Sequence, residues 1–91
     1  MSTPTFTYHT DPGHGWIEVP LPIVAALGIT TEISSFSYTD GRCAYLEEDC
    51  DAWLFVNAYE AAHGARPEFV EKYKEHTPIR NLAPFTSRIT S

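Results

Sequence analysis

The chain has 91 residues, 43% hydrophobic and 13% aromatic, a length that fits one compact domain over residues 1–91 and excludes a two-domain enzyme. Its formal net charge of -6 argues against direct nucleic-acid binding and against attachment to a membrane surface, because phosphate groups attract a positive field. No window reaches the roughly 18 apolar residues of a membrane span. The two cysteines have neither metal-ligand spacing nor disulfide density, so we expect a soluble, cytoplasmic protein.

The first elements expected are a β-hairpin and a short helix. Residues 6–10 and 16–19 are β-prone and alternate in polarity on either side of the turn 11–15, a pattern typical of two antiparallel strands. Pro22 suits the first turn of a helix, and Gly28 suits the left-handed position just after its end. The helix between them is barely two turns long.

A second hairpin is predicted around Asp40-Gly41, because this dipeptide suits a two-residue turn between residues 33–39 and 42–47. The turn implies that Tyr38 pairs with Cys43. In that register the two faces of the hairpin carry different side chains: Phe36, Tyr38, Cys43 and Tyr45 lie on one, and Ser35, Ser37, Ala44 and Leu46 on the other. We expect the aromatic face to be the core.

A longer helix follows, beginning at Asp49 or Asp51 and ending at Gly64. Its apolar side chains recur at helical spacing and should pack on the sheet: Ala52, Phe55, Val56, Tyr59 and His63. Trp53 and Leu54 fall outside this stripe. We expect them to form the interface of a homo-oligomer, since an exposed apolar patch usually marks an interface.

The remaining chain predicts an edge strand and a tail. Residues 69–75 alternate and carry two lysines on one side, which suits a sheet edge. Residues 77–91 have two prolines and no period, so we expect an extended C-terminal tail that packs on the domain or on a partner subunit. The order ββαββαβ indicates an α+β fold with a small, mainly antiparallel sheet, one long helix and one short helix.

Two segments carry the side chains best suited to bind a ligand. The first turn offers imidazoles and an indole for hydrogen bonding and stacking, and the tail offers guanidinium groups beside a phenyl ring, which suit phosphorylated compounds. We predict that the ligand site combines side chains from both segments: His9, His14, Trp16, Arg80, Phe85 and Arg88.

A metal-dependent hydrolase is one alternative, because His9, Asp11 and His14 would together form a ligand set for catalytic zinc. The string from Asp11 to Gly15 also resembles the opening motif of the zinc-dependent N-acetylmuramoyl-alanine amidases, in which this histidine binds zinc. Those domains are roughly twice as long. Asp11 bonding the local backbone explains the turn without an ion, so we expect no metal and no cofactor.

The acidic run Glu47-Glu48-Asp49 with Asp51 has two interpretations. Carboxylates at the start of a helix are favoured by its dipole and then lie in water. Alternatively they form a surface that imitates nucleic-acid phosphates, which would make the protein an acidic inhibitor of a host nucleic-acid-binding complex.

Several segments together resemble a group of small proteins encoded by tailed bacteriophages and prophages: Asp11-Pro12-Gly13-His14-Gly15-Trp16, residues 33–38, the run Tyr45-Leu46-Glu47-Glu48-Asp49-Cys50-Asp51-Ala52, and residues 76–80. The resemblance implies a genomic setting, an infected bacterial cell, and no site residues. In that setting we expect a non-enzymatic binding protein, such as a counter-defence factor that sequesters a small phosphorylated ligand or binds a host protein.

Overall fold

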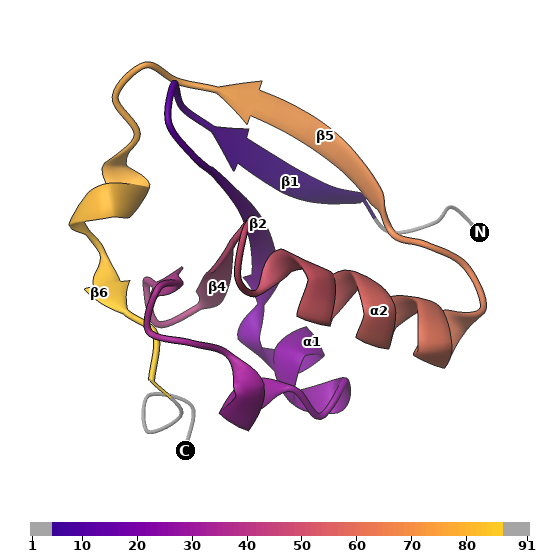
Figure 1. Ribbon diagram of the computed structural model, residues 1–91. Helices are drawn as coiled ribbons and strands as arrows, with labels where there is room; N and C mark the ends of the chain where they lie inside the picture. The colour runs from indigo at the N-terminus through magenta and orange to yellow at the C-terminus, as the bar shows by residue number, and fades with distance from the viewer. Residues whose placement is uncertain (1–4, 87–91) are drawn as a thin grey trace.

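The computed structural model describes residues 5–86 (Figure 1) and has the predicted α+β architecture. Its sheet has the strand order β5-β1-β2-β4-β3-β6, and β1 and β5 are its parallel pair. The strands are β1 (Thr5–Thr10), β2 (Gly15–Pro20), β3 (Tyr38–Thr39), β4 (Cys43–Glu47), β5 (Glu68–Tyr73) and β6 (Ala83–Pro84), and the helices are α1 (Leu21–Ala26) and α2 (Ala52–His63). Short 3-10 helices, η1 (Thr30–Glu32) and η2 (Pro78–Asn81), and strand β6 extend the predicted element order.

The first hairpin and the short helix are confirmed. Strands β1 and β2 pair antiparallel, from Thr7 opposite Glu18 to Thr10 opposite Gly15. The Asp11 carboxylate closes the turn by accepting the backbone N–H groups of Gly13 and His14 at 2.9 and 2.8 Å. This local bond is the reason aspartate is favoured in such turns.

The predicted register of the second hairpin is wrong by two residues. Tyr38 lies opposite Tyr45 rather than Cys43, and Thr39 lies opposite Ala44. Asp40 accepts the N–H groups of Arg42 and Cys43, both at 2.9 Å. Because the carboxylate bonds both residues, the connection between the strands covers residues 40–42, and the strand before it has only two residues.

The core side of this hairpin is also opposite to the one predicted. Ala44 and Leu46 are fully buried, whereas Phe36 is 68% exposed. The reason lies in strand β2, whose Val19 and Ile17 stand opposite Ala44 and Leu46 on the side that both helices cover (Figure 1). We call this side the inner face of the sheet, and the opposite side, which carries Trp16, Glu18, Tyr38, Tyr45 and Glu47, the outer face.

Helix α2 packs on the inner face through the predicted stripe, except that His63 is exposed. Phe55 and Tyr59 surround the ring of Phe6, with centroids 5.0 and 5.7 Å away in edge-to-face geometry, an arrangement that aromatic pairs prefer. Gly64 ends the helix with φ of 75°, a left-handed conformation that glycine adopts without strain. No helix within residues 5–86 has the length and apolar composition to cross a membrane.

Asp51 occupies the N-cap position of α2, but its side chain makes no capping bond. Its carboxylate is buried and accepts hydrogen bonds from the Ser34 backbone, the Ser34 hydroxyl and the Ser37 hydroxyl. It therefore ties the loop before β3 to the start of the helix.

The C-terminal segment packs on its own domain as far as Phe85. Ile79 and Phe85 are 3% and 1% exposed, and the Phe85 N–H donates to the Ser37 carbonyl at 2.8 Å. Strand β6 adds to the sheet beside β3, whereas η2 makes the segment less extended than predicted. Residues 87–91, including the predicted site residue Arg88, lie outside the described residues.

Candidate functional site

A pocket of about 270 Å³ opens on the outer face, where the first turn, the loop after β4 and η2 meet. Its lining combines aromatic, acidic and basic side chains: His14, Trp16, Phe36, Tyr38, Glu47, Asp49, Cys50 and Arg80. These residues come from four stretches of the chain, 14–16, 36–38, 47–50 and Arg80, which the sheet order brings together.

Trp16 lies at the centre of this site and is only 2% exposed. The rings of His14 and Tyr38 lie 6.0 and 6.4 Å from the indole, centroid to centroid. The Arg80 guanidinium carbon lies 5.2 Å from the indole centroid, within the range of a cation–π interaction. Three predicted ligand residues, His14, Trp16 and Arg80, are thus neighbours.

Asp11 holds Arg80 in this position. The guanidinium donates from Nε to Oδ2 at 2.6 Å and from Nη2 to Oδ1 at 3.2 Å, a forked pair that fixes its plane. The bond to Arg80, the largest contribution, keeps the pKa of the Asp11 carboxyl well below its usual range. Arg80 itself is 46% exposed, so its remaining N–H donors are accessible to a ligand.

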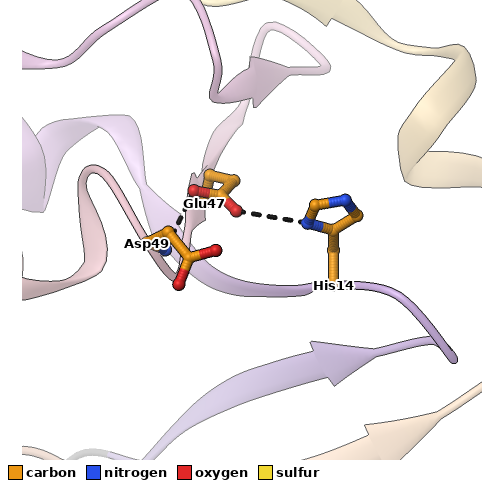
Figure 2. Close-up of side chains that lie close together, drawn as sticks. All are labelled: His14, Glu47 and Asp49. Carbon is orange, nitrogen blue, oxygen red and sulfur yellow. Dashed lines mark hydrogen bonds and ion pairs between the residues drawn. The ribbon is translucent and has the colours of Figure 1, made fainter.

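The pocket also contains three side chains of types that can ligate a metal ion, His14, Glu47 and Asp49, which lie close together (Figure 2). His14 Nδ1 lies 3.4 Å from Glu47 Oε1, and the other Glu47 oxygen accepts the Asp49 backbone N–H at 2.9 Å. One ligand atom from each of His14, Glu47 and Asp49 lies within 4.8 Å of the others. Glu47 is 8% exposed, whereas His14 and Asp49 are exposed. The cluster is therefore buried at Glu47 and open to solvent at the other two side chains.

The Trp16 indole N–H is the buried side-chain polar group that lacks an acceptor among the described residues. Burying a donor without a partner costs about 1–3 kcal/mol. An unpaired buried donor in a folded protein therefore needs an explanation, and a role in a functional site is one of the common explanations.

The other predicted ligand residues lie elsewhere. His9 faces the outer side at a different position, with Nε2 2.7 Å from Glu18 Oε1 and its ring 5.8 Å from that of Tyr45. Phe85 is part of the inner core and is covered. Neither side chain lines the pocket.

The metal-ligand set considered from sequence, His9 with Asp11 and His14, is not assembled, because each member has a different partner. The cluster in the structure shares only His14 with it. Sequence reasoning missed Glu47, Asp49 and Tyr38 as site residues. The alternation of residues 43–47 puts Glu47 on the side of Tyr45, but only the pairing of Glu47 with Trp16 across β2 and β4 brings it to the first turn.

The acidic run does not form one surface. Glu47 and Asp51 are buried, and Glu48 accepts the Tyr8 hydroxyl at 2.6 Å. The predicted interface residues also differ from one another, since Trp53 is 60% exposed whereas Leu54 packs partly buried against the core.

No protein-family model matches the sequence, and neither the curated proteins nor the solved structures contain a match.

Proposed function

We propose that this protein is a non-enzymatic binding protein that takes a small phosphorylated ligand in the outer-face pocket, with a divalent cation held by His14, Glu47 and Asp49. The observation that carries the proposal is the cluster of these three side chains beside Trp16 and Arg80 in one pocket. The expectation of a site without metal is thereby revised.

Charge explains why the cation is needed. Glu47 and Asp49 contribute two negative charges, and Asp11 balances Arg80 through the forked pair. A phosphate entering this pocket without a cation would meet net repulsion. A divalent ion at the three ligands neutralises the two carboxylates and offers coordination positions to phosphate oxygens, while Arg80 supplies hydrogen bonds.

The geometry is close to that of a real site. Two ligand atoms bound tetrahedrally at about 2.1 Å from zinc lie about 3.4 Å apart, and His14 Nδ1 and Glu47 Oε1 are separated by 3.4 Å. The Asp49 carboxylate is exposed and approaches the ion by side-chain rotation. One imidazole and two carboxylates suit Zn²⁺ or Mn²⁺ better than Ca²⁺.

Calorimetric titration of the purified chain with Mn²⁺ and Zn²⁺ tests the cation site. We expect one ion per chain, and His14→Ala, Glu47→Gln and Asp49→Asn should each weaken binding by at least about tenfold, because even outer-shell partners of metal ligands contribute that much. Glu48→Gln, a neighbouring carboxylate outside the cluster, should change affinity little. Absence of binding, or equal affinity in all variants, would refute the site.

Titration with inorganic phosphate and with a nucleoside monophosphate, followed by Trp16 fluorescence in a Trp53→Phe background, tests the ligand class. Binding should require the ion, and Arg80→Ala should weaken it by about tenfold while leaving ion affinity nearly unchanged, since Arg80 is not in the cluster. Ion binding without any phosphate binding would retain the cation site and reject the phosphorylated ligand.

A metal-dependent hydrolase is the second candidate. Three protein ligands with an open position are the arrangement of catalytic zinc sites, and the exposed side of this cluster supplies that position. Turnover of a phosphodiester or ester probe by the metal-loaded protein, lost in Glu47→Gln, would favour the enzyme over the binding protein.

The resemblance to phage-encoded proteins implies an infected cell as the setting, and in that setting we propose a counter-defence role. A binding protein of this kind acts by sequestering a phosphorylated host compound or by occupying a host protein. Native and denaturing mass spectrometry of protein expressed in bacteria distinguishes these two partners, with His14→Ala and Arg80→Ala as the variants that should lose a pocket-bound compound.

A further inference from the structure

Strand β5 is an edge strand with unusually exposed side chains. It lies beside β1 at the edge of the sheet (Figure 1), and all six of its residues are exposed. Three of them are large and apolar: Phe69, Val70 and Tyr73 are 39%, 56% and 61% exposed. An exposed apolar edge strand is a template for pairing with another chain.

The backbone of β5 is ready for such pairing. The Lys74 N–H donates to the Thr10 carbonyl at 2.9 Å, so in the parallel ladder the even-numbered residues of β5 direct their backbone groups to β1. The odd-numbered residues Phe69, Glu71 and Tyr73 therefore direct their N–H and C=O groups outward. The described part of the chain supplies no partner strand on that side.

The side chains of β5 are self-complementary about its centre. Glu68, Val70 and Lys72 lie on the outer face, together with Thr7 and His9 of β1. If two copies of β5 pair antiparallel about a twofold axis at Val70, each Glu68 faces Lys72 of the second copy and the two valines meet. Opposite charges and apolar pairs at directly opposed positions both stabilise a sheet.

We propose that β5 pairs antiparallel with β5 of a second copy of this chain, in the register that places Val70 opposite Val70, joining the two sheets. Lysines on an edge strand usually discourage pairing; in this register Lys72 gains a carboxylate partner instead. The register centred on Glu71 would oppose two glutamates, and the one centred on Lys72 would oppose two lysines, so both are disfavoured. This surface is separate from the outer-face pocket, and on the inner side it adjoins Trp53.

On the inner side, Phe69 and Trp53 line an apolar groove of about 290 Å³ between α2 and the strands β1 and β5. In the proposed register Phe69 of each copy lies diagonal to Phe69 of the other, which covers part of this apolar surface. The proposed dimer therefore covers apolar side chains on both faces of the edge, Phe69 on the inner face and Val70 on the outer face.

Charge reversal tests the register. Sedimentation equilibrium of the full chain should show dimers. Lys72→Glu should weaken them by about tenfold or more, because residue 72 of each copy would then place a carboxylate opposite Glu68 of the other copy. The double variant Glu68→Lys with Lys72→Glu should restore dimerisation. Arg42→Glu, which makes the same charge change in the exposed turn after β3, should leave the dimer intact.

Backbone groups give an independent test. In Glu71→Pro the outward N–H is lost while the bonds to β1 remain, so the variant should be monomeric with an unchanged circular dichroism spectrum. Amide exchange at Phe69 and Tyr73 should slow as wild-type concentration rises. A monomeric wild type, or dimers that survive Glu71→Pro and Lys72→Glu but dissociate in Trp53→Glu, would overturn the proposal.

Discussion

The two faces of the sheet are built from the same strands but by different physical means. On the inner face, aliphatic side chains of β2 and β4 meet the aromatic stripe of α2, and the packing excludes water. On the outer face, alternate residues of the same strands form ion pairs, hydrogen bonds and ring contacts around Trp16 and Glu18. The inner face stabilises the domain, and the outer face holds polar groups in defined positions.

This difference shows how a small domain separates its hydrophobic core from a polar surface that suits ligand binding. Strand alternation sends neighbouring residues to opposite faces, so Ile17 enters the core whereas Trp16 and Glu18 enter the outer surface. On the outer face, the unpaired indole N–H and the buried Glu47 carboxylate both lower the stability of the folded state. The core on the other side of the same strands offsets these losses.

The largest expected effect comes from breaking the inner face. Phe55 is fully buried and contacts Phe6 and Tyr59, so Phe55→Ala should lower the free energy of unfolding by about 3–5 kcal/mol. Phe36→Ala, a matched change at a 68% exposed position beside the outer pocket, should cost less than about 0.5 kcal/mol. Urea denaturation measures both. Equal losses would mean that the two faces do not differ in this way.

A smaller loss of stability is expected for substitution of Asp51, whose buried carboxylate bonds the loop before β3. Asp51→Ala removes the acceptor for the Ser34 backbone and for the Ser34 and Ser37 hydroxyls, leaving donors unpaired at a cost of about 2–3 kcal/mol. Asp49→Ala, two residues away and exposed, should barely change urea stability while weakening metal binding. Comparable stability of the two variants would contradict the assignment of these carboxylates to different tasks.

The smallest expected effect is a titration that distinguishes individual tyrosines. Burial, followed by the hydrogen bond to Glu48, raises the pKa of Tyr8 to about 12 from an ordinary value of 10.0. Because the folded pKa is the higher one, the stability that neutral Tyr8 contributes is fully present below pH 10 and is lost as the pH rises toward 12. Burial also raises the pKa of Tyr45 on the outer face.

Ultraviolet titration should therefore show two tyrosines that ionise late. We expect Tyr8→Phe to remove one of them and Tyr45→Phe to remove the other. Stability measured by urea between pH 10 and 12 should fall less steeply in Tyr8→Phe than in the wild type. Late ionisation that persists unchanged in the double variant Tyr8→Phe with Tyr45→Phe would show that other tyrosines produce it.

Much of the architecture follows from short-range chemistry and was predictable. Asp11 bonds N–H groups two and three residues away, and Gly28 and Gly64 take left-handed φ values just after α1 and α2. The stripe of α2 follows from helical periodicity, which depends on neighbours within two turns. These features predicted the first hairpin, both helices, the edge position of β5 and the fold class.

The second hairpin shows where such reasoning ends. Its turn was located correctly, but Asp40 bonds two N–H groups and widens the loop, which moves the register. The choice of core face depended on β2, whose Val19 meets Ala44 across the sheet. Aromatic content on one side of a hairpin does not reveal which side the helices will cover, because that is settled by the neighbouring strand.

The candidate site depends on contacts between residues distant in the chain. Asp11 and Arg80 are 69 positions apart, and His14 reaches Glu47 only because β2 and β4 are neighbours. Residue types alone indicated that His14, Trp16 and Arg80 suit a ligand, since imidazole, indole and guanidinium are versatile binding groups. Strand order and pairing brought these three together, turned His9 toward Glu18, and placed Phe85 in the core. Local propensities act over a few residues, whereas the burial of one continuous core selects among long-range pairings, and that selection assembled the pocket.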